Sequence, residues 1–223
     1  MLLDADFQLI NEEFYTDSVT PEQFDLLLLE GWRHFGRHFF RYNLGIYENE
    51  IRLVLPLRVR LADFRLSKSQ RRVLRRNADA EVNIGPVTLA DETMNLFELH
   101  KRRFKTGAPS TIYDFLAPEA EPVEVLEINI RREGRLIAAS FFDVGETSIS
   151  SIYGIFDPDE TVGSLGIFTM LCEIDYAFAQ GKTHYYHGYA YEGQSFYDYK
   201  KRFSALEMFD WRGRWLPFEE YHS

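Results

Sequence analysis

Three strand patterns joined by two tight turns constrain the fold of this chain more than any other feature of its sequence. Residues 125–131 alternate apolar and polar side chains, residues 135–143 are mainly apolar, and residues 148–156 form a third strand pattern. Short glycine-containing turns at residues 133–134 and 145–146 separate them, as is typical of hairpins. The sequence therefore predicts a three-stranded antiparallel meander.

A glycine-containing loop, a helix and one further strand follow the meander. The loop ends in residues 163–166, the helix reaches Gln180, and Gly181 stops it. Residues 183–188 then predict a strand, and residues 196–203 predict a short helix. This order of elements resembles that of GNAT-type acyltransferases. We therefore expect an α+β protein with a GNAT-like acyltransferase fold, in which flanking helices cover a mixed, mainly antiparallel sheet.

The first half of the chain contains two capping boxes that mark helix starts. Residues 20–23 read Thr-Pro-Glu-Gln and residues 67–70 read Ser-Lys-Ser-Gln, so a helix is expected to begin within each stretch. The alternating pattern of residues 50–60 predicts a strand between them. A further helix is expected over residues 91–105.

Glycine and proline gather between residues 106 and 122, which makes this stretch the best candidate for a boundary. We therefore divide the chain into residues 1–106, an N-terminal region with a basic helix, and residues 107–223, a C-terminal GNAT-like region. The chain has 223 residues, of which 45% are apolar and 16% aromatic. Because that is enough for one sizeable core, we expect the two regions to form one compact unit.

Composition also excludes some classes of protein. The apolar and aromatic content is too high for a mainly disordered chain, and no run approaches the ~18 apolar residues of a membrane-spanning helix. The acidic N-terminal segment lacks the basic start of a signal peptide. The single cysteine, Cys172, can neither form a disulfide within the chain nor hold a thiolate metal cluster alone, and it lies in a helical apolar pattern typical of core residues. We expect a cytoplasmic protein without a membrane partner.

Charge is distributed unevenly along the chain. The formal charge is −8 for residues 1–30, +8 for residues 31–80 and −10 for residues 81–223. The basic part ends in a predicted helix that carries Lys68, Arg71, Arg72, Arg75 and Arg76. Like charges at helical spacing repel one another, so something must offset them. The negative charge that offsets them belongs either to a nucleic-acid phosphate backbone or to the acidic N-terminal segment of the protein itself.

The loop Gly163-Ser164-Leu165-Gly166 leads directly into a predicted helix. Backbone N–H groups and the helix dipole favour an anion at such an end, so a phosphate or the 3′ end of an RNA fits there. A tight turn between a strand and a helix explains the same glycines without any ligand. The sequence leaves both interpretations open.

Tyrosines and cations are concentrated near the C-terminus. Residues 185–191 contain four tyrosines and His187, and residues 196–202 combine three aromatic residues with three cations. Such a mixture suits unpaired bases, which stack on aromatic rings for ~1–3 kcal/mol each. Ordinary core packing explains several of the same residues, because strand alternation lets only half of residues 183–189 face one site.

Several segments resemble the aminoacyl-tRNA–protein transferases, which comprise arginyl-transferases and bacterial leucyl-transferases that act on N-terminal Asp or Glu. The similar segments, in chain order, are residues 30–41, 56–59, 64–72, 163–166, 185–189 and 199–203. They cover most of the chain, and residues 1–106 would be the N-terminal transferase region. The resemblance implies that the protein moves Arg or Leu from charged tRNA to the N-terminal α-amine of proteins that begin with Asp or Glu.

One departure from that family concerns metal binding. The family usually carries a cysteine cluster, with an associated metal or iron–sulfur centre, where this chain has residues 42–50 without a thiol. Thiolates therefore cannot hold zinc or an iron–sulfur cluster here, and we expect a hairpin turn at Glu48 and Asn49 instead. His34 and His38 are expected to be structural, because no further ligand stands near them. We expect no metal and no cofactor, with aminoacyl-tRNA as a co-substrate.

The resemblance also implies roles for individual residues. Transfer is the aminolysis of an activated ester, which requires aligned reactants, a path for a proton and a stabilised oxyanion. The residues that would bind tRNA are Lys68, Arg71, Arg72, Arg75, Arg76, Gly163, Ser164 and Gly166. The candidates for the proton relay are Tyr153, Tyr186, His187 and Tyr189. The candidates for binding the acidic acceptor side chain are Lys200 and Arg202.

Two other functions fit the same sequence. An acetyl-CoA-dependent GNAT N-acyltransferase would hold the CoA pyrophosphate at the Gly163 loop, although the longer glycine pattern of such enzymes is absent. A degenerate, non-catalytic binder of tRNA or peptide would keep the basic and aromatic surfaces, and it would account for the missing thiols.

Overall fold

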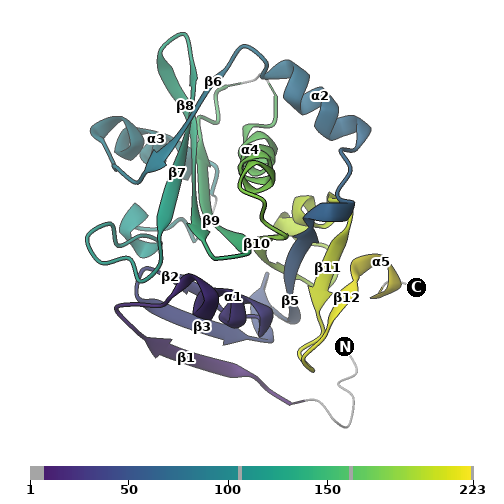
Figure 1. Cartoon of the computed structure of the whole chain (residues 1–223). Coiled ribbons are helices and arrows are strands. Elements are labelled where there is room, and N and C mark those ends of the chain that lie inside the picture. The colour runs from purple at the N-terminus through teal and green to yellow at the C-terminus, as the bar shows by residue number, and fades with distance from the viewer. Residues whose placement is uncertain (1–7, 105–106, 161–162, 222–223) are drawn as a thin grey trace.

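The computed structural model describes residues 8–104, 107–160 and 163–221, most of which surround one large sheet (Figure 1). The strands of this sheet run in the order β12 (Trp215–Pro217), β11 (Leu206–Phe209), β5 (Glu50–Arg60), β10 (His184–Tyr191), β9 (Ser148–Phe156), β8 (Arg135–Val144), β7 (Val125–Arg132) and β6 (Glu81–Pro86). Strand β4 (Leu44–Tyr47) pairs with β5 beside this path.

The predicted meander is confirmed. Strand β7 pairs antiparallel with β8, and β8 pairs antiparallel with β9. Glu133 and Gly134 join the first two strands with positive φ values of 52° and 77°, the conformation that a tight hairpin turn requires. Strand β8 is buried along almost its whole length because it has a paired strand on both sides and a helix over each face.

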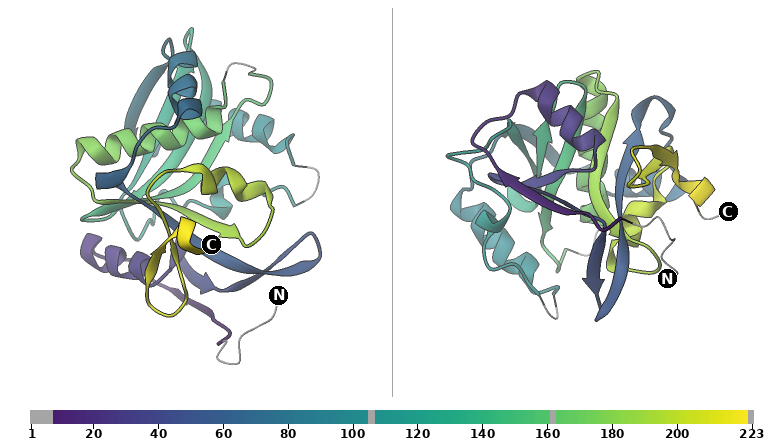
Figure 2. Two further views of the ribbon diagram at one scale, coloured as in Figure 1. Left: turned by 90° about the vertical axis from the view of Figure 1, so that its right-hand side faces the viewer. Right: turned by 90° about the horizontal axis from the view of Figure 1, so that it is seen from below.

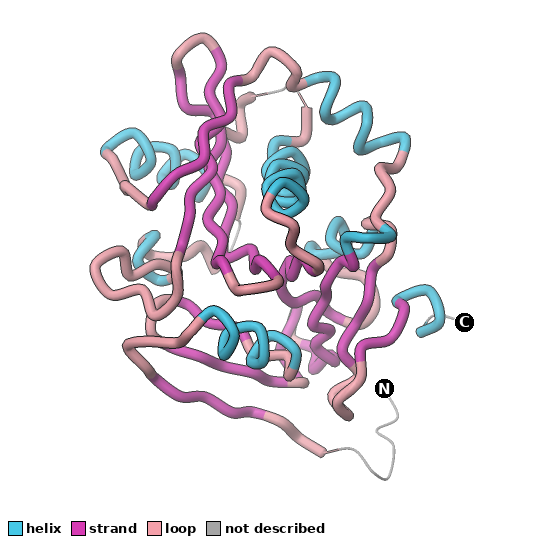
Figure 3. Tube along the Cα trace, viewed as in Figure 1, coloured by secondary structure: helices cyan, strands magenta, loops and turns pink. Residues whose placement is uncertain are grey.

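Helix α4 (Leu165–Ala179) and strand β10 complete the predicted order of elements. Strand β10 runs parallel to β9, whereas it pairs antiparallel with β5 on its other side. Helix α4 covers one face of β8 and β9, and α3 (Asp91–Lys101) covers the other (Figures 1 and 3). The predicted α+β fold is therefore confirmed, with a mixed, mainly antiparallel sheet and a helix between two parallel strands, as in a GNAT-like fold.

Strands from both halves of the chain alternate in the large sheet. Strand β5 comes from the N-terminal half and lies between β10 and β11, and β6 forms the edge beside β7. The two regions divided at residues 106 and 107 therefore contribute to a single sheet. Thr106 lies outside the described residues.

Helices begin where the capping boxes predicted. Helix α1 (Pro21–Leu29) follows Thr20 and α2 (Lys68–Arg76) follows Ser67, and both boxes are formed. The short helices are η1 (Leu61–Asp63), η2 (Ile112–Asp114), η3 (Phe196–Arg202) and α5 (Phe218–Tyr221). Helix α3 ends at Lys101, earlier than expected, and η3 is a 3₁₀ helix. Within the described ranges, no helix combines the length and apolarity needed to cross a membrane.

A smaller sheet in the order β1 (Asn11–Tyr15), β3 (His38–Tyr42) and β2 (Arg33–Phe35) packs with α1 beneath the large sheet (Figures 1 and 2). His34 and His38 therefore lie on the neighbouring strands β2 and β3. The buried ring of His34 lies 2.8 Å from the Gly36 carbonyl through Nδ1 and 2.9 Å from the Asp143 carboxylate through Nε2. These contacts give His34 the structural role that the sequence predicted.

Candidate active site

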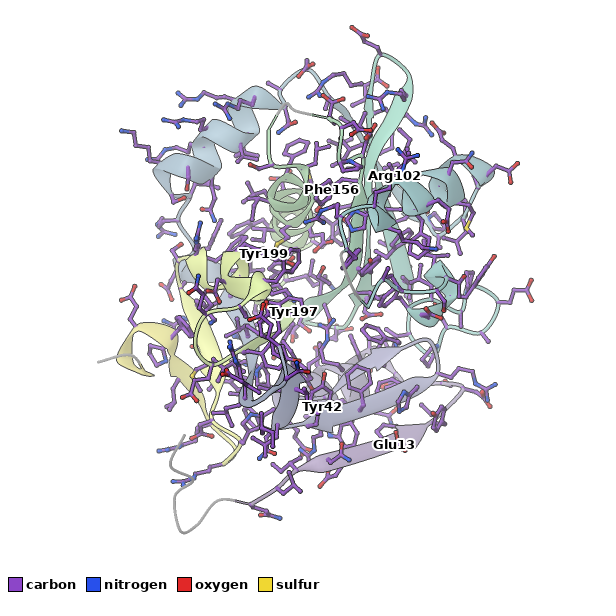
Figure 4. All side chains as sticks on the ribbon, turned by 180° about the vertical axis from the view of Figure 1, so that it is seen from behind. Glu13, Tyr42, Arg102, Phe156, Tyr197 and Tyr199 are labelled. Carbon is purple, nitrogen blue, oxygen red and sulfur yellow. The ribbon has the colours of Figure 1, made fainter. Side chains whose placement is uncertain are left out.

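A cavity of about 580 Å³ opens where the two parallel strands separate. Strands β9 and β10 are paired only from Ser148 to Ser150, opposite His184 to Tyr186, and the residues beyond this pairing line the cavity. Its wall is largely aromatic. Seen from behind, the side chains of Phe156, Tyr199, Tyr197 and Tyr42 follow one another down this side of the molecule (Figure 4), and all four line the cavity.

A bulge in β10 shapes the cavity wall. Tyr186 pairs with Arg58 and Gly188 pairs with Leu57, so His187 is an extra residue in this strand. Gly188 has a φ of +90°, and a Cβ atom there would lie 3.0 Å from Lys200 Nζ and 3.4 Å from Arg33 Cζ. Glycine is therefore required both by the backbone conformation and by the two cations beside it.

Arg33 and Lys200 place two cations deep in the cavity. Arg33 donates to Ser150 Oγ at 2.9 Å and to the Ser151 carbonyl at 2.5 Å, and Lys200 Nζ donates to the Tyr189 carbonyl at 3.1 Å. Burial and the nearby charge of Arg33 lower the pKa of Lys200 to about 7. This pair would stabilise negative charge that develops inside the cavity.

Glu173 supplies a carboxylate to the same cavity from the mainly apolar α4. It is fully buried, and its oxygens accept from Tyr185 Oη at 2.6 Å and Ser151 Oγ at 3.4 Å. Burial raises the pKa of Glu173 to about 7, against the opposing effect of these hydrogen bonds and of Arg33. Arg33 and Glu173 were not predicted as site residues.

The candidates for a proton relay occupy different places. His187 is 2% exposed and lines the cavity, and neither ring nitrogen has a partner within residues 8–104, 107–160 and 163–221. Burial and the neighbouring Lys200 and Arg33 hold its pKa well below the ordinary value, so the ring is neutral. The Tyr153 hydroxyl also lines the cavity without a partner among the described groups, and burial raises its pKa to about 12.

Tyr186 and Tyr189 are engaged elsewhere. Tyr186 projects to the opposite side of β10, where its hydroxyl accepts from Arg58 at 3.1 Å and its ring packs against Trp215. It is not part of the cavity wall, because successive residues of a strand face opposite sides. The ring of Tyr189 lines the cavity, but its hydroxyl donates to the Gly31 carbonyl at 2.6 Å. His187 and Tyr153 are therefore the relay candidates that the geometry supports.

The cations of α2 lie on the surface. Lys68, Arg71, Arg72, Arg75 and Arg76 are exposed, and none of them forms an ion pair with a carboxylate in the part of the chain that the structure describes. The acidic residues of the N-terminal segment pair with other groups instead: Glu12 with Arg41, Glu13 with His38 and Asp17 with Arg37. Asp4 and Asp6 lie outside the described residues.

The Gly163 loop connects this basic helix to the cavity. Asn77, which caps the C-terminal end of α2, is buried, and its Nδ2 atom donates to the Gly163 carbonyl at 3.1 Å. Helix α2 packs against α4, as the left view of Figure 2 shows. Ser164 and Gly166, at the N-terminal end of α4, line the cavity. The two groups of predicted tRNA-binding residues are thus neighbours, and one of them reaches the cavity.

The two predicted acceptor-binding cations differ in position. Lys200 lines the cavity, whereas Arg202 is exposed and does not. A third cation that the sequence reading missed, Arg103, lies in the cavity wall and is exposed, which places it at the mouth. Only its position near the end of the predicted helix of residues 91–105 could have drawn attention to it.

Residues 42–50, which contain no thiol, form a hairpin. Residues 42–50 lead through β4 into the turn at Glu48 and Asn49, which have positive φ values of 50° and 63°, as predicted. Cys172 is half-buried in α4, and burial raises the pKa of its thiol to about 12. These residues do not fit a thiolate-bound metal or iron–sulfur centre.

The order of elements is that of a GNAT-like fold, and the cavity lies where its two parallel strands separate. Residues 92–210, more than half of the chain, match the family profile described as "Arginine-tRNA-protein transferase, C terminus". The chain is 31% identical over 206 residues to the aspartate/glutamate leucyltransferase of Stenotrophomonas maltophilia, covering 88% of this chain and 80% of that protein. It is 34% identical over 175 residues to the enzyme of the same description from Xanthomonas axonopodis, covering 73% and 70%.

This chain therefore belongs to the aminoacyl-tRNA–protein transferase family. Among solved structures, FemX superposes with a TM-score of 0.49 at 10% identity, over 86% of this chain and 68% of that one.

Proposed function

We propose that this transferase moves leucine from leucyl-tRNA to the α-amine of proteins whose N-terminal residue is Asp or Glu. Its relatives at 30–35% identity are described as aspartate/glutamate leucyltransferases. The observation that carries the proposal is the cavity itself: an aromatic chamber with cations in its wall, next to an exposed basic helix.

The charge of the cavity favours leucine over arginine as the donor. The charged side chains among its described lining residues are Arg33, Arg103, Lys200 and Glu173. Glu173, the one carboxylate among these described residues, is already engaged by hydrogen bonds from Tyr185 and Ser151. An unpaired third guanidinium among these cations would be repelled, whereas leucine packs against aromatic walls at no such cost. The same cations favour an acidic acceptor.

The position of α2 supports a path for the tRNA. Its exposed cations, which the sequence predicted to bind tRNA, would contact phosphates of the acceptor stem. The link between Asn77 and Gly163 then leads from α2 to Ser164 and Gly166, where the 3′ end would enter the cavity. The backbone at the start of the 15-residue helix α4 would favour the terminal phosphate.

The chemistry needs few groups. The acceptor amine attacks the ester carbonyl, a C–N bond forms, the C–O bond to the ribose breaks, and one proton passes from the nitrogen to the ribose oxygen. Arg33 and Lys200 would face the oxyanion, while His187 and Tyr153 would carry or orient the proton. An α-amine with a pKa of ~7.7–8.0 requires no strong base. We propose that no metal or cofactor takes part, and that the enzyme works in the cytoplasm beside its tRNA.

Transfer of labelled amino acid tests the proposal directly. The protein is incubated with tRNA charged with labelled leucine or labelled arginine, and with peptides that begin with Asp, Glu or Ala. Label from leucine on the Asp and Glu peptides is the expected result. Label from arginine alone would overturn the choice of donor, and binding of charged tRNA without any transfer would favour the non-catalytic binder. A thermal shift with acetyl-CoA would instead favour the acetyltransferase.

A further inference from the structure

We propose that Arg103, at the mouth of the cavity, recognises the side-chain carboxylate of the acceptor's N-terminal Asp or Glu. This assignment rests on the transfer reaction proposed above and identifies the residue that makes it selective for acidic acceptors. It differs from the prediction from sequence, which considered Lys200 and Arg202.

The contacts of Arg103 hold its guanidinium group in place. Its Cζ atom lies 4.3 Å from the ring centre of Phe156 on β9 and 5.5 Å from that of Phe196 on η3. Its Nη1 atom lies 3.4 Å from Nε2 of His100 on α3. Aromatic rings contact the flat face of a guanidinium, so they leave N–H donors along its edge available to a ligand.

These three neighbours carry no compensating charge. Phe156 and Phe196 are apolar, and burial lowers the pKa of His100 to about 4, so its ring is neutral at neutral pH. No carboxylate in the described ranges forms an ion pair with Arg103, whereas the adjacent Arg102 lies 3.9 Å from Asp159. A positioned arginine without a charged partner, in the wall of a cavity, suits a carboxylate that binds through two hydrogen bonds.

The deep cations are less suited to this task. Arg33 is hydrogen-bonded to Ser150 and Ser151, and Lys200 is hydrogen-bonded to the Tyr189 carbonyl. An acceptor protein enters with its α-amine first, and its chain must leave through the mouth. The side chain of residue one branches from the carbon next to the amine, so the carboxylate at its end can lie nearer the mouth than the reacting nitrogen. Arg103 therefore serves the acceptor, while Arg33 and Lys200 remain for the ester.

The test compares acceptor peptides that differ in one group. Transfer from leucyl-tRNA is measured for peptides that begin with Asp or with its neutral isostere Asn, using the wild type, Arg103→Gln, Arg103→Lys and the neighbouring control Arg102→Gln. We expect Arg103→Gln to lower kcat/KM for the Asp peptide roughly tenfold to a hundredfold, mainly through KM, and to leave the Asn peptide unchanged. Arg103→Lys should recover part of the loss, and Arg102→Gln should behave as the wild type.

Two results would overturn the assignment. Equal losses for the Asp and Asn peptides would show that Arg103 supports the fold or the tRNA, and an unchanged preference for Asp in Arg103→Gln would show that another group reads the carboxylate. Binding of a fluorescent Asp peptide in the absence of tRNA separates this question from the proposed function. If the wild type binds the Asp peptide, Arg103→Gln does not, and neither transfers leucine, the proposed transfer reaction is contradicted but the recognition of the carboxylate by Arg103 is supported.

Discussion

Asn77 Nδ2 donates a hydrogen bond to the carbonyl oxygen of Gly163 at 3.1 Å, which ties the end of the basic helix to the loop that opens the cavity. The same nitrogen contacts the Val73 carbonyl at 2.9 Å, and Oδ1 accepts from Arg132 at 3.1 Å. Gly163 has a φ of +100°, and a Cβ atom there would lie 3.0 Å from Asn77 Nδ2. The exposed basic helix α2 and the loop at the cavity are thus held in a fixed position relative to each other.

Asn77→Ala should loosen this connection. It leaves the buried Gly163 carbonyl without its donor, so we expect the free energy of unfolding to fall by ~1–3 kcal/mol in urea titrations. The KM for charged tRNA should rise, because α2 and the Gly163 loop are no longer fixed relative to each other. Ala78→Ser, at the next and exposed position, is the control. A variant as stable and as active as the wild type would show that the contact is incidental.

Arg72→Glu combined with Arg75→Glu should weaken tRNA binding in a salt-dependent manner. Each phosphate contact that is lost should reduce the slope of log K against log salt by roughly 0.7–0.9. Filter binding between low and moderate salt measures this slope. Arg37→Glu with Arg212→Glu makes the same change in net charge elsewhere, and it should have a smaller effect. Equal slopes in both double variants would mean that α2 is only a solvated face.

His187→Gln should slow transfer and leave substrate binding largely intact. The His187 ring is buried in the cavity wall with both nitrogens free of partners among the described residues. Loss of a positioned proton-transfer group typically costs ~10²–10⁴-fold in rate, so single-turnover transfer should fall within that range. His184→Gln, on the same strand but outside the cavity, is the matched control. Wild-type turnover in His187→Gln would leave Tyr153 or the tRNA ribose as the relay.

The sequence was sufficient for features that depend on neighbours along the chain. The capping boxes at Thr20 and Ser67, the turn at Glu133 and Gly134, and the strand order of the meander are local, and the structure contains all of them. Predicting that β5 lies between β10 and β11 would have required knowledge of pairings more than a hundred residues apart.

The candidate site shows the same limit. Arg33 acquires its place through Ser150 and Ser151, which are 117 and 118 residues away, and no local pattern marks that contact. Tyr186 and His187 were both candidates for the proton relay, because strand alternation predicts that only some of these residues face one site but not which ones face the cavity. The basic stripe of α2 was recognised from spacing alone, but its relation to the cavity depends on the buried side chain of Asn77.

Lys200→Arg should change the pH dependence of transfer. Because the pKa of Lys200 is about 7, half of its charge is lost at pH 7 and most of it at pH 8. The acceptor amine, with a pKa of ~7.7–8.0, becomes reactive over the same interval. If the charged lysine stabilises the oxyanion, kcat/KM of the wild type rises as the amine loses its proton and falls as Lys200 loses its own, so the profile has a narrow maximum between about pH 7 and 8.

Arginine keeps its charge, so the kcat/KM of Lys200→Arg should not fall at alkaline pH and should level off above about pH 8. Lys200→Gln should be slow at every pH. The measurement is single-turnover transfer from pH 6 to 9, corrected for spontaneous hydrolysis of the ester, and identical alkaline limbs in the wild type and Lys200→Arg would remove Lys200 from the reaction.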